Sequence, residues 1–136
     1  MTTQFGRTRF ALLLWALLVV SAGASAEAPR PTAADLHAAY ESGVVFVDVR
    51  TEAEWLAGHL KNAVHLPLDE IGARAASLLP SKDTDLVLYC RTGRRAQIAA
   101  EQLRQLGYTG VSAMTGGYDD LEAAGYPVGR TSSGGL

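Results

Sequence analysis

Cysteine is almost absent from this chain of 136 residues, in which Cys90 is the only one. A single thiol cannot form a disulfide within the chain, so the fold must be held together by its hydrophobic core. The sequence also lacks clusters of histidine, cysteine and carboxylate residues at metal-ligand spacing. We therefore expect neither a metal site nor another cofactor.

An excess of basic residues and a long apolar run are missing as well. The chain has 12 Lys and Arg against 14 Asp and Glu, a formal net charge of −2. Nucleic-acid binding usually requires a basic face, so we expect no nucleic-acid partner. The apolar run over residues 10–20 is about half of the roughly 20 residues that a membrane-spanning helix needs, so we expect no permanent membrane span.

The N-terminal segment nevertheless has a recognisable layout. Arg7 and Arg9 precede the apolar run, and small residues follow it over 21–26. This order is typical of a secretory signal peptide. We expect cleavage after Ala26, with Ala24 as the alternative site, and export of the mature protein to a bacterial periplasm.

Removal of residues 1–26 leaves 110 residues and, because it takes two arginines and no acid, shifts the formal net charge to −4. A chain of that length forms one ordinary domain. We expect the domain over 27–136, with a core over about 32–128 and a flexible tail over 129–136.

The rest of the chain alternates between strand-like and helix-like patterns. Buried strands are predicted at 44–47 and 86–89, further strands at 63–66 and 111–114, and helices at 32–42, 68–79, 95–106 and 119–124, with a short helix that begins at Thr51. The helix at Thr51 begins with a capping box completed by Glu54. This alternation predicts a single α/β domain with a mostly parallel central sheet flanked by helices on both faces. Such sheets place their sites at the carboxyl ends of strands, where Asp48 and Cys90 both lie.

Cys90 opens the segment Cys90-Arg91-Thr92-Gly93-Arg94-Arg95 between a buried strand and an amphipathic helix. Backbone amides and the helix dipole favour negative charge there, so we expect an anion-binding loop with a reactive thiolate at its centre. A lone cysteine can instead be a small buried hydrophobe. The three arginines that follow it are poorly suited to an apolar core, which favours the reactive cysteine.

The sequence resembles the rhodanese-like domain family over about 32–128. The motifs that carry this resemblance are Val47-Asp48-Val49-Arg50, Glu54-Trp55, Gly58-His59-Leu60, Asn62-Ala63, Pro67, Tyr89-Cys90-Arg91-Thr92-Gly93 and Gly116-Gly117-Tyr118. The family often has Pro-Gly where this chain has Lys61-Asn62, a local difference in one turn.

The resemblance implies a sulfurtransferase in which Cys90 is catalytic and carries the sulfur as a persulfide. A small anionic donor such as thiosulfate loads the sulfur, and a thiol, cyanide or a protein accepts it. The loop residues 91–95 would bind the donor, with Arg91 and Arg94 closest to the anion. Arg95 is expected to bind the donor or to pair inside the protein with Asp48, and Asp48 either orients the loop or pairs with an arginine.

Two other functions remain open at this point. A cysteine-dependent phosphatase also holds an anion in a cysteine-arginine loop, but the tyrosine-phosphatase pattern requires arginine at the position of Ala96. A non-enzymatic sulfur carrier, or a binding module of the cell envelope, is the second alternative. Composition does not separate it from an enzyme.

Overall fold

The computed structural model describes residues 29–130 of the chain. The expected signal peptide over 1–26 and residues 131–136 of the expected tail lie outside the described residues. Within the described part, every helix is too short or too polar to span a bilayer.

Four parallel strands form the central sheet, as predicted. They are β1 (Val45–Asp48), β3 (Val64–His65), β4 (Leu86–Tyr89) and β5 (Val111–Ala113), in the order β3-β1-β4-β5. The longest two are the β-branched and aliphatic runs seen in the sequence, and they pair side by side with Asp48 opposite Tyr89. The carboxyl ends of β1 and β4 therefore lie next to each other, and Cys90 follows at that edge.

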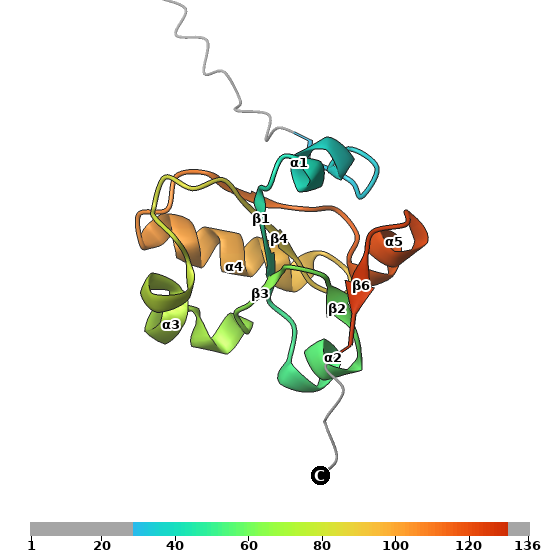
Figure 1. Cartoon of the computed structure of the whole chain (residues 1–136). Helices are drawn as coiled ribbons and strands as arrows, with labels where there is room; N and C mark the ends of the chain where they lie inside the picture. Colours follow the sequence, from blue (N-terminus) through green and yellow to red (C-terminus); the bar gives the residue numbers. More distant parts are fainter. Residues whose placement is uncertain (1–28, 131–136) are drawn as a thin grey trace, which may run out of the picture.

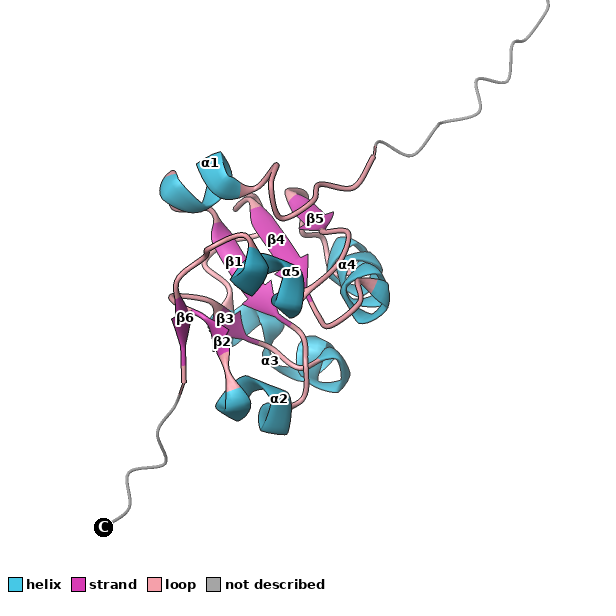
Figure 2. Ribbon diagram, turned by 90° about the vertical axis from the view of Figure 1, so that its right-hand side faces the viewer, coloured by secondary structure: helices cyan, strands magenta, loops and turns pink. Residues whose placement is uncertain are grey.

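Helices cover both faces of this sheet. They are α1 (His37–Glu41), α2 (Glu52–Ala57), α3 (Ile71–Leu78), α4 (Arg94–Gln105) and α5 (Tyr118–Ala123), with a 3₁₀ turn η1 (Leu68–Glu70) before α3. Figure 1 shows α3 and α4 on one side of the strands and α5 on the other, and Figure 2 shows the same layers after a quarter turn. The α/β architecture with helices on both faces is confirmed.

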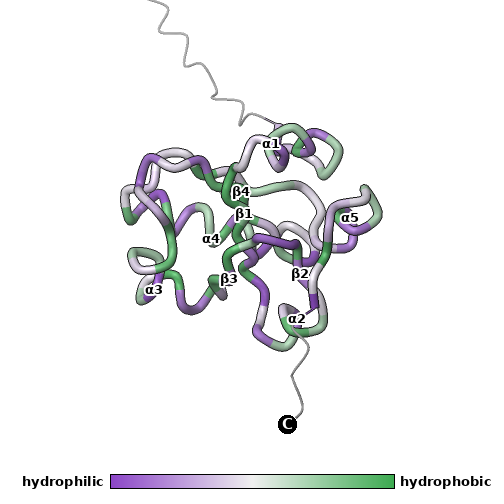
Figure 3. Tube along the Cα trace, in the orientation of Figure 1, coloured by the Kyte–Doolittle hydropathy of each residue, from purple (hydrophilic) through white to green (hydrophobic). Residues whose placement is uncertain are grey.

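The two faces bury separate cores because side chains alternate along each strand. Val47 and Leu88 face the core under α3 and α4, whereas Phe46 and Val87 face the core under α1 and α5. Residues 45–47 of β1 and all of β4 are accordingly apolar, and Figure 3 shows these strands in green at the centre of the domain. This pattern is expected for a parallel sheet covered on both sides.

A second sheet was not predicted. It pairs β2 (His59–Leu60) with β6 (Val128–Gly129) in antiparallel orientation. Each strand has two residues, too few to show the alternation that identifies a strand in a sequence. Gly129, expected in the tail, thus pairs with His59.

The first helix is shorter than predicted. Thr32 was expected to cap it, but the Asp35 carboxylate accepts hydrogen bonds from both the amide and the hydroxyl of Thr32. A turn therefore occupies 33–36, and α1 begins at His37. The other predicted helices and strands agree with the structure to within one or two residues at most ends.

Candidate active site

Cys90 lies directly after β4 and is completely buried, in the core shared with α3 and α4. Its Sγ atom accepts a hydrogen bond from the amide of Gly93 at 3.0 Å. Gly93 immediately precedes α4 and has a positive φ of 90°. An added Cβ there would lie 3.2 Å from the carbonyl oxygens of both Met114 and Gly116, so only glycine fits without strain. The loop thus holds the thiol beside Gly93, at the N-terminus of α4.

A turn over 116–118 supports the loop from the opposite side. The amide of Tyr118 donates to the Cys90 carbonyl at 2.8 Å. A Cβ on Gly117 would overlap the carbonyls of Cys90 and Arg91. The Asp120 carboxylate in turn accepts from the Gly117 amide at 2.8 Å, which fixes the turn. The backbone of the two segments is therefore in direct contact.

The three loop arginines have different surroundings. Arg95 forms a two-pronged ion pair with Glu54, at 2.7 Å and 2.8 Å. Hydrogen bonds from Arg95, together with smaller contributions from the hydrogen bonds of Thr51, lower the pKa of Glu54 from 4.5 to about 2, against the effect of burial. Arg91 and Arg94 are exposed, and no ion pair is found for either of them among residues 29–130.

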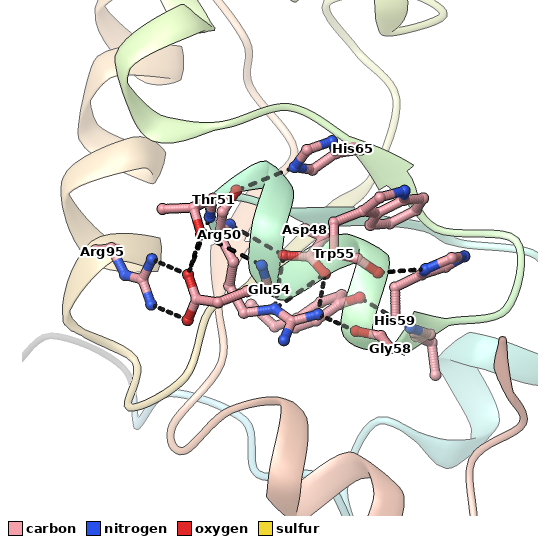
Figure 4. A network of polar contacts seen from close by, with 11 residues as sticks. Asp48, Arg50, Thr51, Glu54, Trp55, Gly58, His59, His65 and Arg95 are labelled. Carbon is pink, nitrogen blue, oxygen red and sulfur yellow. Dashed lines mark hydrogen bonds and ion pairs between the residues drawn. The ribbon is translucent and has the colours of Figure 1, made fainter. Parts of the chain in front are cut away.

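Asp48 pairs with Arg50 and not with Arg95, so the expected Asp48–Arg95 pair is wrong. The Asp48 carboxylate is fully buried and accepts four hydrogen bonds from the amide and guanidinium of Arg50. Arg50 also donates to the Gly58 carbonyl at 2.6 Å. Burial alone would lower the pKa of Arg50, but the hydrogen bonds and charge of Asp48 raise it. The pair joins β1 to the end of α2 (Figure 4).

Glu54 is held on α2 by the predicted capping box. The Thr51 side chain accepts from the Glu54 amide, and the Glu54 carboxylate accepts from the Thr51 amide. The next residue, Trp55, stacks within 10° of parallel on the rings of both His59 and His65. The His59 ring also bonds the Trp55 carbonyl and the His65 ring bonds the Arg50 carbonyl, so both rings are fixed by hydrogen bonds. These contacts fix the helix that presents Glu54 to the loop (Figure 4).

An open pocket of about 250 Å³ lies beside the loop. Arg91 and Tyr118 line it together with Arg50 and Glu54. Asp119 and Glu122 on α5 and Arg130 after β6 line it as well. Asp119, Glu122 and Arg130 were not among the candidate site residues identified from the sequence. Charged residues are ordinary at exposed positions such as these, and only the fold brings them next to residue 91.

Known proteins resemble this chain in sequence. The sequence model of the rhodanese-like domain family matches residues 32–124 of this chain. Thiosulfate sulfurtransferase PspE of Escherichia coli K12 is 34% identical over 76 residues, 56% of this chain and 72% of that protein. A sulfurtransferase of Allochromatium vinosum is 38% identical over 85 residues, 62% of this chain and 78% of that protein.

The fold has solved counterparts as well. The solution structure of the rhodanese-like domain of the Alr3790 protein from Anabaena superimposes with a TM-score of 0.68 at 26% identity, over 81% of this chain and 88% of that one. The chain therefore belongs to the rhodanese-like domain family. Its sulfurtransferase relatives support a sulfurtransferase of the rhodanese type.

Proposed function

We propose that the protein takes a sulfane sulfur from a small anionic donor such as thiosulfate, holds it as a persulfide on Cys90, and passes it to a thiol, cyanide or protein acceptor. The observation that carries this proposal is the position of the only cysteine. Its Sγ atom accepts a hydrogen bond from the Gly93 amide at the N-terminus of α4, where backbone amides and the helix dipole favour negative charge.

The first half-reaction is a displacement between two sulfur atoms. The Cys90 thiolate attacks the outer sulfur of thiosulfate, the bond between the two donor sulfurs breaks, and sulfite leaves with the electron pair. The product is a Cys90 persulfide, and no external oxidant is needed. Covalent catalysis of this kind divides one transfer into two easier steps.

Two loop arginines support the binding of an anionic donor. Arg91 and Arg94 are exposed on either side of Gly93, and each guanidinium offers forked donors to an oxyanion. Arg95 has a different role in the proposal, since its ion pair with Glu54 holds the start of α4 against α2. A phosphatase fits less well, because position 96 is a buried alanine and the last loop arginine is already paired.

The burial of Cys90 adds a requirement to the proposal. With no exposed surface on the residue, a donor reaches the sulfur only when part of the loop moves. We expect iodoacetamide to alkylate Cys90 in the folded protein, and thiosulfate to slow that alkylation. A folded protein that stays unmodified until denaturant is added would contradict a reactive role for this thiol.

Mass spectrometry tests the persulfide directly. After incubation with thiosulfate and removal of the excess, the protein should be heavier by one sulfur atom, and cyanide should reverse the gain. Cys90→Ser should show no gain. Loading without repeated turnover would favour a sulfur carrier, and full sulfurtransferase activity in Cys90→Ser would refute the mechanism.

A further inference from the structure

The pocket beside the Cys90 loop has an unusual arrangement of charge. Two cations, Arg91 and Arg130, and two anions, Asp119 and Glu122, line its space of about 250 Å³. No ion pair among the described residues joins any of the four. The opposite charges therefore border one open space without neutralising each other.

The other charges of the pocket are already engaged. Arg50 is bound to Asp48 and Glu54 to Arg95. Arg130 donates its Nε to the Ala57 carbonyl, which leaves the terminal nitrogens of its guanidinium for another partner. Asp119 and Glu122 are three residues apart on α5, a spacing that places them on the same face of a helix.

Tyr118 is surrounded by charges of both signs. Burial raises the pKa of its hydroxyl, Glu122 and Asp119 raise it further, and Arg50 and Arg130 act in the opposite direction. The same residue donates its amide to the Cys90 carbonyl. The pocket is thus tied through the backbone to the residue that is proposed to carry the sulfur.

This arrangement discriminates between classes of small molecule. A dianion is attracted by the two arginines but repelled by the two carboxylates. A simple cation is attracted by the carboxylates but repelled by the arginines. An uncharged thiol gains nothing from either pair. A molecule that carries one ammonium and one carboxylate group can pair with both.

We propose that this pocket binds the sulfur acceptor, and that the acceptor is a zwitterionic thiol with the ammonium and carboxylate groups of a free α-amino acid, such as cysteine. Its carboxylate meets Arg91 and Arg130, and its ammonium meets Asp119 and Glu122. The inference rests on the proposed sulfur transfer and names the acceptor class for it.

The second half-reaction then balances without a further reactant. The acceptor, ionised to its thiolate by loss of a proton to solvent, attacks the outer sulfur of the Cys90 persulfide. The bond between that sulfur and Sγ breaks, and the electron pair returns to Cys90 as a thiolate. The acceptor leaves as a persulfide, so one sulfur–sulfur bond replaces another.

Binding is tested first without any sulfur chemistry. L-Serine, a zwitterion with no thiol, is titrated into the full protein while amide NMR signals of Arg91 and of residues 118–122 are followed. We expect saturable shifts, with ethanolamine and glycolate at least about fivefold weaker because each keeps only one of the two contacts. No saturable shift with L-serine, or equal affinity for L-serine and glycolate, overturns the proposal.

Variants then assign the two halves of the pocket. The double variant Asp119→Asn with Glu122→Gln should lose L-serine binding, whereas Glu41→Gln should keep it. Glu41 is an exposed acid on α1, outside the pocket, so its substitution changes the net charge in the same direction. Thermal melts check that both proteins remain folded. Binding that is unchanged in the double variant also overturns the proposal.

Transfer is measured on protein that has been loaded with thiosulfate and freed of excess donor. The rate at which Cys90 loses its sulfur is measured with four thiols: L-cysteine, cysteamine, 3-mercaptopropionate and 2-mercaptoethanol. For each thiol, the rate with the variant is divided by the rate with the wild type, so that the intrinsic reactivity of the thiol cancels. The double variant should slow L-cysteine and cysteamine by about fivefold and leave 2-mercaptoethanol unchanged. Arg130→Gln should instead slow L-cysteine and 3-mercaptopropionate.

The two proposals fail in different ways. If thiosulfate never loads Cys90, the sulfur-transfer mechanism is wrong, and the L-serine titration still decides whether the pocket recognises a zwitterion. If Cys90 loads but the double variant slows all four thiols equally or none of them, sulfur transfer stands and the acceptor assignment is wrong.

Discussion

Replacement of Glu54 by glutamine should weaken the link between α2 and the Cys90 loop. In the wild type, the fall in the Glu54 pKa from 4.5 to about 2 corresponds to roughly 3.5 kcal/mol, at about 1.4 kcal/mol for each unit. Both side chains of the pair are about 30% exposed, at 31% for Arg95 and 29% for Glu54, so solvent screens part of this energy. We expect Glu54→Gln to destabilise the protein by about 1–2 kcal/mol at pH 7.

The stability that the Arg95–Glu54 pair contributes depends on pH in a defined way. A carboxyl group with a lowered folded-state pKa stabilises the protein fully above its unfolded-state pKa, near 4.5, and loses that effect as pH falls toward about 2. Glutamine does not titrate. The stability difference between wild type and Glu54→Gln should therefore be constant above about pH 5.5 and should shrink steadily between pH 4.5 and pH 2.

Urea denaturation followed by circular dichroism across that pH range measures the difference. Glu70→Gln is the matched control, because it breaks the exposed pair with Arg74 on adjoining turns, whose side chains are 41% and 48% exposed. We expect less than about 0.5 kcal/mol from it. A difference between wild type and Glu54→Gln that stays the same from pH 6 to pH 2.5 would refute the assignment of this energy to the ion pair.

Three further outcomes are expected. Gly117→Ala should lower the free energy of unfolding, measured by urea denaturation, by about 2–3 kcal/mol, because its Cβ would overlap the Cys90 loop. Gly72→Ala should raise it by about 0.5–1 kcal/mol, because Gly72 lies in α3 with open space around it. Arg91→Ala and Arg94→Ala should each raise the thiosulfate KM by about fivefold with little change in melting temperature. Sequencing of the secreted protein should find a mature N-terminus after Ala26, and an intact Met1 would contradict export by cleavage.

The central sheet was predictable because the sequences of its two middle strands, β1 and β4, are themselves typical of buried strands. Residues 45–47 and 86–89 are apolar on both alternating faces, which is what two covering layers of helices require. The β2–β6 pair has no such signal. It forms because the chain returns to residues 59–61 from far along the sequence, with the Lys61 amide donating to the Pro127 carbonyl at 2.8 Å.

Local contacts of the site were predictable and long-range partners were not. The Thr51–Glu54 capping box depends on a spacing of three residues and was confirmed. The partner of Arg95 depends on the positions of two acids at the same sheet edge. Asp48 was the expected partner, but Arg50 lies two residues away from it and already binds it, which leaves Glu54 for Arg95. The order of charges along the chain does not show which of them the fold brings together.

The contacts of the loop also indicate where a buried thiol becomes accessible. The start of the loop is fixed by the bond from Tyr118 to the Cys90 carbonyl, Gly93 is enclosed by the 114–116 backbone, and the end is held by the Arg95–Glu54 pair. Between these points Arg91 and Thr92 are exposed, and no hydrogen bond from either is found among residues 29–130. The least constrained part of the loop is thus the two residues that follow Cys90, one of which lines the charged pocket. The movement that the burial of Cys90 requires is therefore expected at these two residues.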